Sequence, residues 1–290
     1  MEVRFVPGEE IDTLKWNSCV HYATNGNIYG YRWFLDGVTR DWDALIEGDY
    51  ESVFPLPWRK TLWRNKQLDQ PDLIRELGIF SIHVLSGVRV KAFLDAIPEE
   101  YGRGTLHLNE MIRSFEHQSV SWSEKDNYQI LLANDYEEIA DNYTPQGLKL
   151  LSLAAEKQAY MPVSNLKPER IAAYFLEQGK ASKQRTRQFH ALQRLMYNAL
   201  HRGWGFAMGV VDASENLLAA DFFFNSHGKV VSALGLQRSD RCDTGALPLL
   251  YDTLIRSQAG RPAILDLNGN KQLGELLGAQ QNSYPVVSLV

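Results

Sequence analysis

The chain has 290 residues, of which 44% are hydrophobic and 22% charged, the composition of a globular protein that can bury a substantial core. No apolar run approaches the roughly 18 residues that a membrane span needs, and the acidic N-terminal stretch lacks the apolar centre of a secretory signal, so we expect a cytoplasmic protein. Cys19 and Cys242 lack the paired spacing of a zinc or disulfide framework. The seven histidines form no ligand pattern, so no metal is expected.

The charge is unevenly distributed along the chain. Residues 1–160 carry 16 Lys and Arg against 25 Asp and Glu, a net of −9, whereas residues 161–290 carry 14 against 10, a net of +4. This change of sign predicts two domains, 1–160 and 161–290, and places any anion site in the second. The positive excess is too small for duplex nucleic acid, and the pattern does not indicate an oligomeric state.

Apolar periodicity predicts alternating helices and short strands along the first half. The expected strands are 2–6, 42–47, 51–56, 105–108 and 128–133. The expected helices are 9–22, 28–38, 88–97, 109–119 and a linking helical region, 136–160.

The second half gives a clearer order of elements. Two helices, 165–179 and 186–203, precede an antiparallel meander with strands 206–211, 217–224 and 230–236. The expected elements that follow are helix 243–260, strand 263–267, helix 272–277 and strand 285–290. The first half can be written in nearly the same order, so we interpret the chain as a tandem duplication of one α/β unit with mixed sheets.

Residues 229–268 form a strand, a loop, a helix and a second strand, which predicts two parallel strands joined by a right-handed crossover. The loop contains Arg238 and Arg241 and leads into a helix N-terminus, where free N–H groups and the helix dipole favour an anion. The alternative is an ordinary βαβ unit with solvated arginines.

This order of elements resembles the GNAT N-acetyltransferase superfamily, and two such units in one chain resemble the FemABX-type and related bacterial acyltransferases. Three short phrases are similar to that group: residues 217–223 in a middle strand, 265–269 at a strand end, and 277–279 after the last helix. The resemblance implies two tandem GNAT-like domains and covers nearly the whole chain, more securely after residue 161.

In the superfamily, the coenzyme A pyrophosphate binds the loop before the helix that follows the fourth strand. The signature there is Gln or Arg, two residues, Gly, one residue, then Gly or Ala, and residues 241–246 match it in part, at Arg241 and Ala246. The resemblance implies that acetyl-CoA or another acyl-CoA is held by Gln237, Arg238, Arg241, Thr244, Gly245 and Ala246. Thr244 replaces the family glycine and narrows the N–H cradle, although Gly245 could compensate by a shifted register.

Acyl transfer to an amine needs a base and a proton donor for the leaving group. Asp221 lies in an otherwise apolar strand and is the candidate base if it faces a cleft, where burial would raise its pKa; the alternative is a solvated position. Many GNAT enzymes carry an acidic tyrosine where this chain has Gly274, so Tyr284 is the candidate substitute, with a structural tyrosine as the alternative. Asn268 replaces an acidic residue of the relatives and is the candidate substrate-binding residue.

The sequence therefore predicts an N-acyltransferase that moves an acyl group from an acyl-CoA to the primary amine of a small molecule or peptide, in the cleft between the halves. A FemABX-like transferase dependent on aminoacyl-tRNA is one alternative, although the coiled-coil insertion is missing and the basic charge is modest. A catalytically silent GNAT-fold protein that binds a small anion or a protein is the other, indicated by Gly274, Thr244 and Asn268.

Overall fold

The computed structural model describes residues 2–61, 66–156, 160–238 and 245–289, and the contacts divide the chain into two compact units. Unit 1 comprises residues 1–125 and 283–290, and unit 2 comprises residues 126–282. The boundary expected after residue 160 falls inside unit 2. The reason is that Tyr128, Ile130 and Ile139 belong to the same apolar cluster as Leu265.

Unit 1 is a mixed sheet with helices, and its strand order is β1-β2-β3-β4-β6-β14. The strands are β1 (Val3–Val6), β2 (Trp42–Glu47), β3 (Ser52–Lys60), β4 (Lys66–Asp69), β5 (Phe80–Ser81), β6 (Gly104–His107) and β14 (Gln280–Leu289). The helices are α1 (Thr13–Tyr22), α2 (Arg32–Val38) and α3 (Gly87–Asp95), with short 3₁₀ turns η1 (Gly8–Glu10), η2 (Ile28–Gly30) and η3 (Glu99–Tyr101). Helix α1 begins where the Asp12 carboxylate accepts the N–H groups of Leu14 and Lys15.

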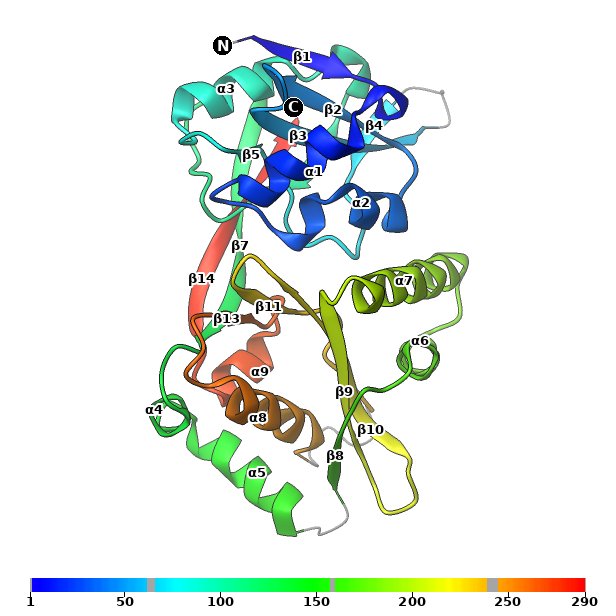
Figure 1. The fold of residues 1–290 in the computed structure, drawn as a ribbon, viewed down its shortest axis with the longest axis vertical. Helices are drawn as coiled ribbons and strands as arrows, with labels where there is room; N and C mark the ends of the chain where they lie inside the picture. The colour runs from blue at the N-terminus through cyan, green and yellow to red at the C-terminus, as the bar shows by residue number, and fades with distance from the viewer. Residues whose placement is uncertain (1, 62–65, 157–159, 239–244, 290) are drawn as a thin grey trace. The chain divides into compact units, whose positions relative to one another are not determined.

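Unit 2 has the strand order β7-β13-β11-β10-β9-β8. Its strands are β7 (Val120–Leu131), which begins in unit 1, β8 (Met161–Ser164), β9 (Gly205–Val211), β10 (Leu217–Ser226), β11 (Lys229–Ser232), β12 (Leu236–Gln237) and β13 (Ile264–Asp266). Its helices are α4 (Tyr136–Ala140), α5 (Pro145–Glu156), α6 (Pro168–Glu177), α7 (Lys183–His201), α8 (Ala246–Gln258) and α9 (Lys271–Leu276). Strands β11 and β13 are parallel, with α8 in the crossover, as the sequence predicts. Helices α8 and α9 lie on one face of this sheet, and α6 and α7 lie on the other (Figure 1).

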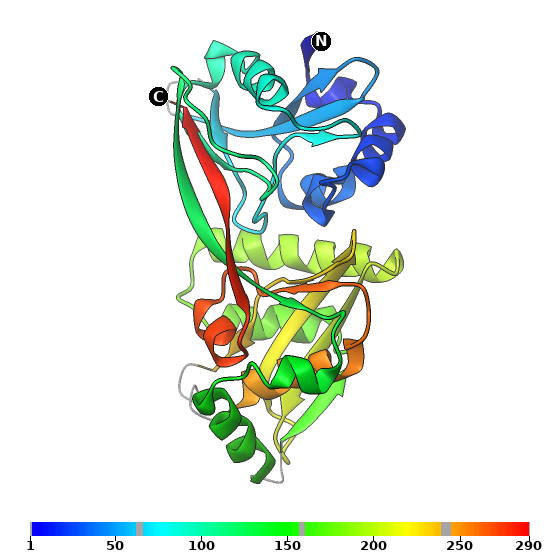
Figure 2. The ribbon, with the colours of Figure 1, turned by 90° about the vertical axis from the view of Figure 1, so that its left-hand side faces the viewer.

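The final strands of the two halves are exchanged. Strand β7, from the first half of the sequence, pairs antiparallel with β13, and the C-terminal strand β14 pairs antiparallel with β6. The two long strands run side by side in Figure 2 and are neighbours in the sheet order. Val287 of β14 therefore lies in the apolar core of unit 1, although it is near the C-terminus.

The structure differs from two of the expected elements and adds strands that were not expected. Residues 109–119 are irregular instead of helical. The Asn109 side-chain oxygen accepts the Met111 N–H at 2.9 Å, and its side-chain amide donates to the Asn25 backbone carbonyl at 3.2 Å. Such local side-chain bonds compete with helix formation. The strand expected at 230–236 is interrupted between β11 and β12, and β4, β5 and β8 were not anticipated.

Within the described ranges, no helix is both long enough and apolar enough to cross a membrane.

Candidate functional site

The carboxyl ends of β11 and β13 form the candidate site of unit 2. The described pairing of these parallel strands ends at Val231 and Asp266. Strand β12, which follows β11 in the chain, pairs with β10 and not with β13. The residues that follow, 233–238 and 268–270, are half-buried, whereas the strand ends before them are buried. We call these two segments the strand-end strip. It is the place where polar groups of unit 2 meet at the end of two parallel strands.

Asp221 supports the strip from the α8 side. One carboxylate oxygen accepts the N–H groups of Phe222 at 2.7 Å and Leu234 at 2.9 Å. The other oxygen accepts the hydroxyls of Ser232 and Tyr251, each at 2.6 Å. Burial raises the pKa of Asp221, and these hydrogen bonds only partly offset the desolvation. Asp221 is completely buried, so it neither faces a cleft nor lies on a solvated face, the two positions expected from the sequence.

Asp266 supports the other half of the strip. One of its oxygens accepts the Asn268 backbone N–H at 2.8 Å, and the other accepts the Asn127 side-chain amide at 2.8 Å. The Asn127 side-chain oxygen accepts the Gly269 N–H at 2.9 Å, and the Asn268 side-chain amide donates to the Ala233 backbone carbonyl at 3.4 Å. Asn268 has a φ of 52°, a left-handed conformation that this network holds in place. The candidate substrate-binding residue is thus fixed on the strip.

The start of α8 is covered by α5. Gly245 is left-handed, with a φ of 73°, and a Cβ on it would lie 2.1 Å from the carbonyl oxygen of Leu150 in α5. Ala246 and Leu247 are 1% and 5% exposed, and Pro248, also buried, has no N–H. Gly245 and Ala246 therefore form a packed contact between two helices.

Of the other four predicted cofactor residues, the structure describes Gln237 and Arg238. Gln237 pairs with Ala219 in β12, and the Arg238 N–H donates to the Leu218 carbonyl at 3.4 Å, so both lie at the end of the strip. Arg241 and Thr244 lie outside the described residues.

Tyr284 belongs to unit 1, not to the strip of unit 2. It is 2% exposed within β14, the Arg75 guanidinium lies 4.8 Å from its ring centre, and the His107 ring lies 5.7 Å away. His107 contacts the Arg75 carbonyl through Nδ1 at 3.2 Å and the Lys125 ammonium through Nε2 at 3.1 Å. The pKa of His107 is lowered to about 4, mainly by burial and to a smaller extent by the positive charges of Lys125 and Arg75. His107 is therefore neutral at pH 7, with Nε2 accepting from Lys125 and Nδ1 donating to Arg75.

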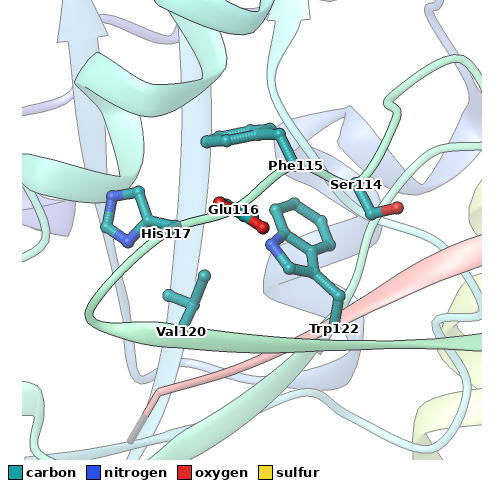
Figure 3. A pocket seen from close by; sticks show the side chains of 6 residues that line it. All are labelled: Ser114, Phe115, Glu116, His117, Val120 and Trp122. Atoms are coloured by element: carbon teal, nitrogen blue, oxygen red, sulfur yellow. The ribbon is translucent and has the colours of Figure 1, made fainter.

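Unit 1 has a separate hollow between the irregular segment after β6 and the start of β7 (Figure 3). Its volume is about 500 Å³, and its lining residues are Ser114, Phe115, Glu116, His117, Val120 and Trp122. The Phe115 and Trp122 ring centres are 5.4 Å apart. His117 accepts the Ser119 N–H through Nδ1, so its Nε2 carries the proton and donates to Asp95 at 2.9 Å. The hollow is aromatic with one fixed histidine, and it contains none of the predicted site residues.

Sequence reasoning missed the groups that hold the strip, namely Ser232, Tyr251, Asp266 and Asn127. Asp266 offered a signal like that of Asp221, since it is a carboxylate inside a short apolar strand. The partners Tyr251 and Asn127 come from α8 and β7, and no local pattern brings them to these aspartates. Among the described residues, no group of three or more His, Cys, Asp or Glu side chains is placed to hold a metal ion.

Chemically, the strip offers hydrogen-bonding groups and few titratable ones. Arg238 is its only charged side chain, and both supporting aspartates already accept several hydrogen bonds. Such a site can bind and orient a polar ligand, and it holds neither a nucleophile nor an exposed carboxylate.

Several solved structures share the fold over almost their whole length. FemX superposes with a TM-score of 0.65 at 10% identity, covering 100% of this chain and 98% of FemX. A tandem GNAT protein from the clavulanic acid biosynthesis pathway gives a TM-score of 0.54 at 14% identity, covering 100% and 98%. The C-terminal domain of a putative lysylphosphatidylglycerol synthetase from Agrobacterium fabrum gives 0.53 at 5% identity, covering 95% and 90%.

These similarities confirm the predicted tandem-GNAT, FemX-like fold, with its mixed α/β architecture. No protein-family profile and no curated protein sequence matches the chain.

Proposed function

We propose that the protein is an N-acyltransferase that transfers an acyl group from an acyl thioester, such as an acyl-CoA, to a primary amine. The observation that carries the proposal is the strand-end strip, in which the ends of β11 and β13 present half-buried hydrogen-bonding groups. The full-length likeness to FemX and to a tandem GNAT protein supports it, although one fold can serve many functions.

The reaction makes an amide and a free thiol. The amine nitrogen attacks the thioester carbonyl, the C–N bond forms, the C–S bond breaks, and the sulfur leaves with the proton that the nitrogen loses. In the proposal, the strip contributes binding and orientation, which alone can lower the barrier considerably. In the proposal, Asp221 is buried and does not act as a base, and the amine reaches the strip already deprotonated. The rate should therefore rise with pH towards the pKa of the amine, about 10 for a lysine-like group.

We assign Asp221 and Asn268 different parts in this proposal. Asp221 holds the backbone at Leu234 and the hydroxyl of Tyr251, so it is a positioning residue. Asn268 is half-buried on the strip and is the substrate-binding residue. Tyr284 lies beside Arg75 and His107 in unit 1, an environment that supports a structural role.

A second donor class, an aminoacyl ester of tRNA, is favoured by one observation. The start of α8, where a coenzyme A diphosphate is expected, is packed against α5. The net charge of +4 in residues 161–290 is compatible with an RNA ligand, although it is small.

The test is a donor-and-acceptor panel followed by mass spectrometry. The protein is incubated with a set of acyl-CoAs or with aminoacyl-tRNA, each with pooled primary amines, and amide products are measured. Amide formation that increases with pH, and that falls at least tenfold in Asn268→Ala while the exposed variant Gln281→Ala stays active, supports the proposal. If no donor yields an amide, the proposed function is wrong, and the alternative of a silent GNAT-fold binding protein remains to be tested by ligand binding.

A further inference from the structure

Helix α7 and the chain on either side of it carry a concentrated positive charge. Residues 178–211 contain six Lys and Arg and no Asp or Glu, whereas the average of 35 acidic residues in 290 would place about four in a stretch of 34. The unit around them is neutral, because residues 126–282 hold 16 Lys and Arg against 16 Asp and Glu. The positive charge is therefore local to this helix and is hidden in the net charge of the unit.

The geometry of α7 brings much of this charge to one face. The face that packs on the unit is apolar and buried, and it consists of Ala191, Leu192, Leu195, Met196 and Ala199. The opposite face repeats at steps of four and three residues, the spacing of neighbours on successive turns of a helix. We call this exposed face the α7 stripe, and its residues are Lys183, Arg187, His190, Arg194, Tyr197 and His201. At 1.5 Å per residue the stripe is about 27 Å long.

Large apolar side chains are exposed on the same pair of helices. Helix α6 packs beside α7, and its Glu169 carboxylate accepts the Tyr197 hydroxyl (Figure 1). Leu176 of α6 is 38% exposed, and Tyr197 and Leu200 of α7 are 46% and 39% exposed. The α6–α7 pair thus offers cations and apolar groups together.

We propose that the α7 stripe docks the protein on an anionic lipid surface. Lys183, Arg187 and Arg194 face the lipid phosphates, and each cation near such a surface strengthens binding about fivefold. The exposed apolar side chains lie at the level of the headgroups, as in helices that rest on a bilayer without crossing it. A nucleic acid would also pair with the cations, but it would leave the exposed leucines in water. The observations therefore favour the lipid surface, and the docking is independent of the proposed acyl transfer.

Sedimentation of the full-length chain with lipid vesicles tests the docking. The vesicles are phosphatidylcholine alone, or phosphatidylcholine with about 30% phosphatidylglycerol, in about 0.1 M salt, where charges within roughly 10 Å still interact. The stripe variant combines Lys183→Gln, Arg187→Gln and Arg194→Gln, because glutamine suits a helix as well as the residues it replaces. The control variant changes the net charge equally by replacing three exposed cations of the same unit with glutamine, namely Lys149, Arg261 and Lys271.

The wild-type protein should bind the anionic vesicles at least tenfold more tightly than the neutral ones, and the stripe variant should lose about a hundredfold of that affinity. The control variant should stay within about threefold of the wild type, and about 0.5 M salt should release the wild type from the vesicles. A charge-retaining variant with Lys183→Arg, Arg187→Lys and Arg194→Lys should bind like the wild type. Circular dichroism melts check that all the variants are folded.

Equal binding of the wild type to both vesicle types, binding that salt leaves unchanged, or equal losses in the stripe and control variants overturns the proposal. A gel shift with single-stranded poly(U) RNA completes the test. If the wild type binds this RNA through the stripe and does not bind the anionic vesicles, the surface is a nucleic-acid site and the lipid proposal is wrong. None of these readouts uses a thioester, so the proposed acyl transfer stands or fails separately.

Discussion

Replacing Gly245 by alanine tests the contact between α5 and α8 directly. The residue has a φ of 73°, so an L side chain costs about 1–2 kcal/mol in backbone strain. The added Cβ would also lie 2.1 Å from the oxygen and 2.9 Å from the carbon of the Leu150 carbonyl. Both atoms are helix backbone, so relief requires moving α5, and overpacking of this kind costs about 1–3 kcal/mol. The expected loss of unfolding free energy is therefore about 2–5 kcal/mol.

Gly203 provides a matched control. It has a φ of 70°, and a Cβ on it would meet no atom within 4 Å. Gly203→Ala should therefore cost only the backbone term, about 1–2 kcal/mol, reduced by the lower entropy of the unfolded chain. Urea unfolding followed by circular dichroism gives the two values, and hydrogen exchange of the α5 peptide reports the local opening. Equal destabilisation by the two variants, with α5 still protected, would refute the proposed packing.

Three further predictions concern buried or half-buried groups within each unit. The pKa of His107 is lowered to about 4, below the value near 6.5 of an unfolded histidine, so stability should fall as pH drops from 6.5 to 4. We expect about 1–2 kcal/mol after allowing for its partial exposure, and pH-dependent urea titrations should show a flatter profile for His107→Gln. Val287→Ala should lower the free energy of unfolding of unit 1, followed by tryptophan fluorescence, by about 2 kcal/mol, and the exposed variant Gln281→Ala should lower it by almost nothing. Equal values for the two variants would show that β14 is not part of that core. Asp221→Ala leaves buried donors, including the Tyr251 hydroxyl, without an acceptor, so it should cost about 3–5 kcal/mol; thermal melts should show a smaller loss for Asp221→Asn, and equal losses would contradict the network.

The order of elements could be predicted because it depends on local patterns. Residues 229–268 were expected to form a parallel strand pair around a helix, and β11, α8 and β13 do so. The helix starts at Ala246 instead of 243, within the usual uncertainty of helix ends. The strand exchange could not be predicted, since the alternation in β14 identifies a strand without naming its partner. Tyr284 consequently lies in unit 1.

The candidate site was less accessible to sequence reasoning, for two physical reasons. The first concerns Asp221, which was expected either in a cleft or on a solvated face. Both faces of β10 are covered, by α8 on one side and by α6 on the other, so its carboxylate is buried. The second concerns the expected anion site at Gly245. Its covering helix, α5, comes from residues about 90 positions earlier in the chain, and no pattern within the loop reveals that contact.

The central claim is that this protein forms amides from acyl thioesters. The most direct measurement is the mass of a defined primary amine after incubation with an acyl-CoA and the purified full-length chain. We predict an amide adduct that resists hydroxylamine, forms in proportion to enzyme concentration, and forms faster at pH 9 than at pH 7. An amine that stays unmodified across the acyl-CoA panel, or an adduct that forms equally well without the protein, would contradict the claim.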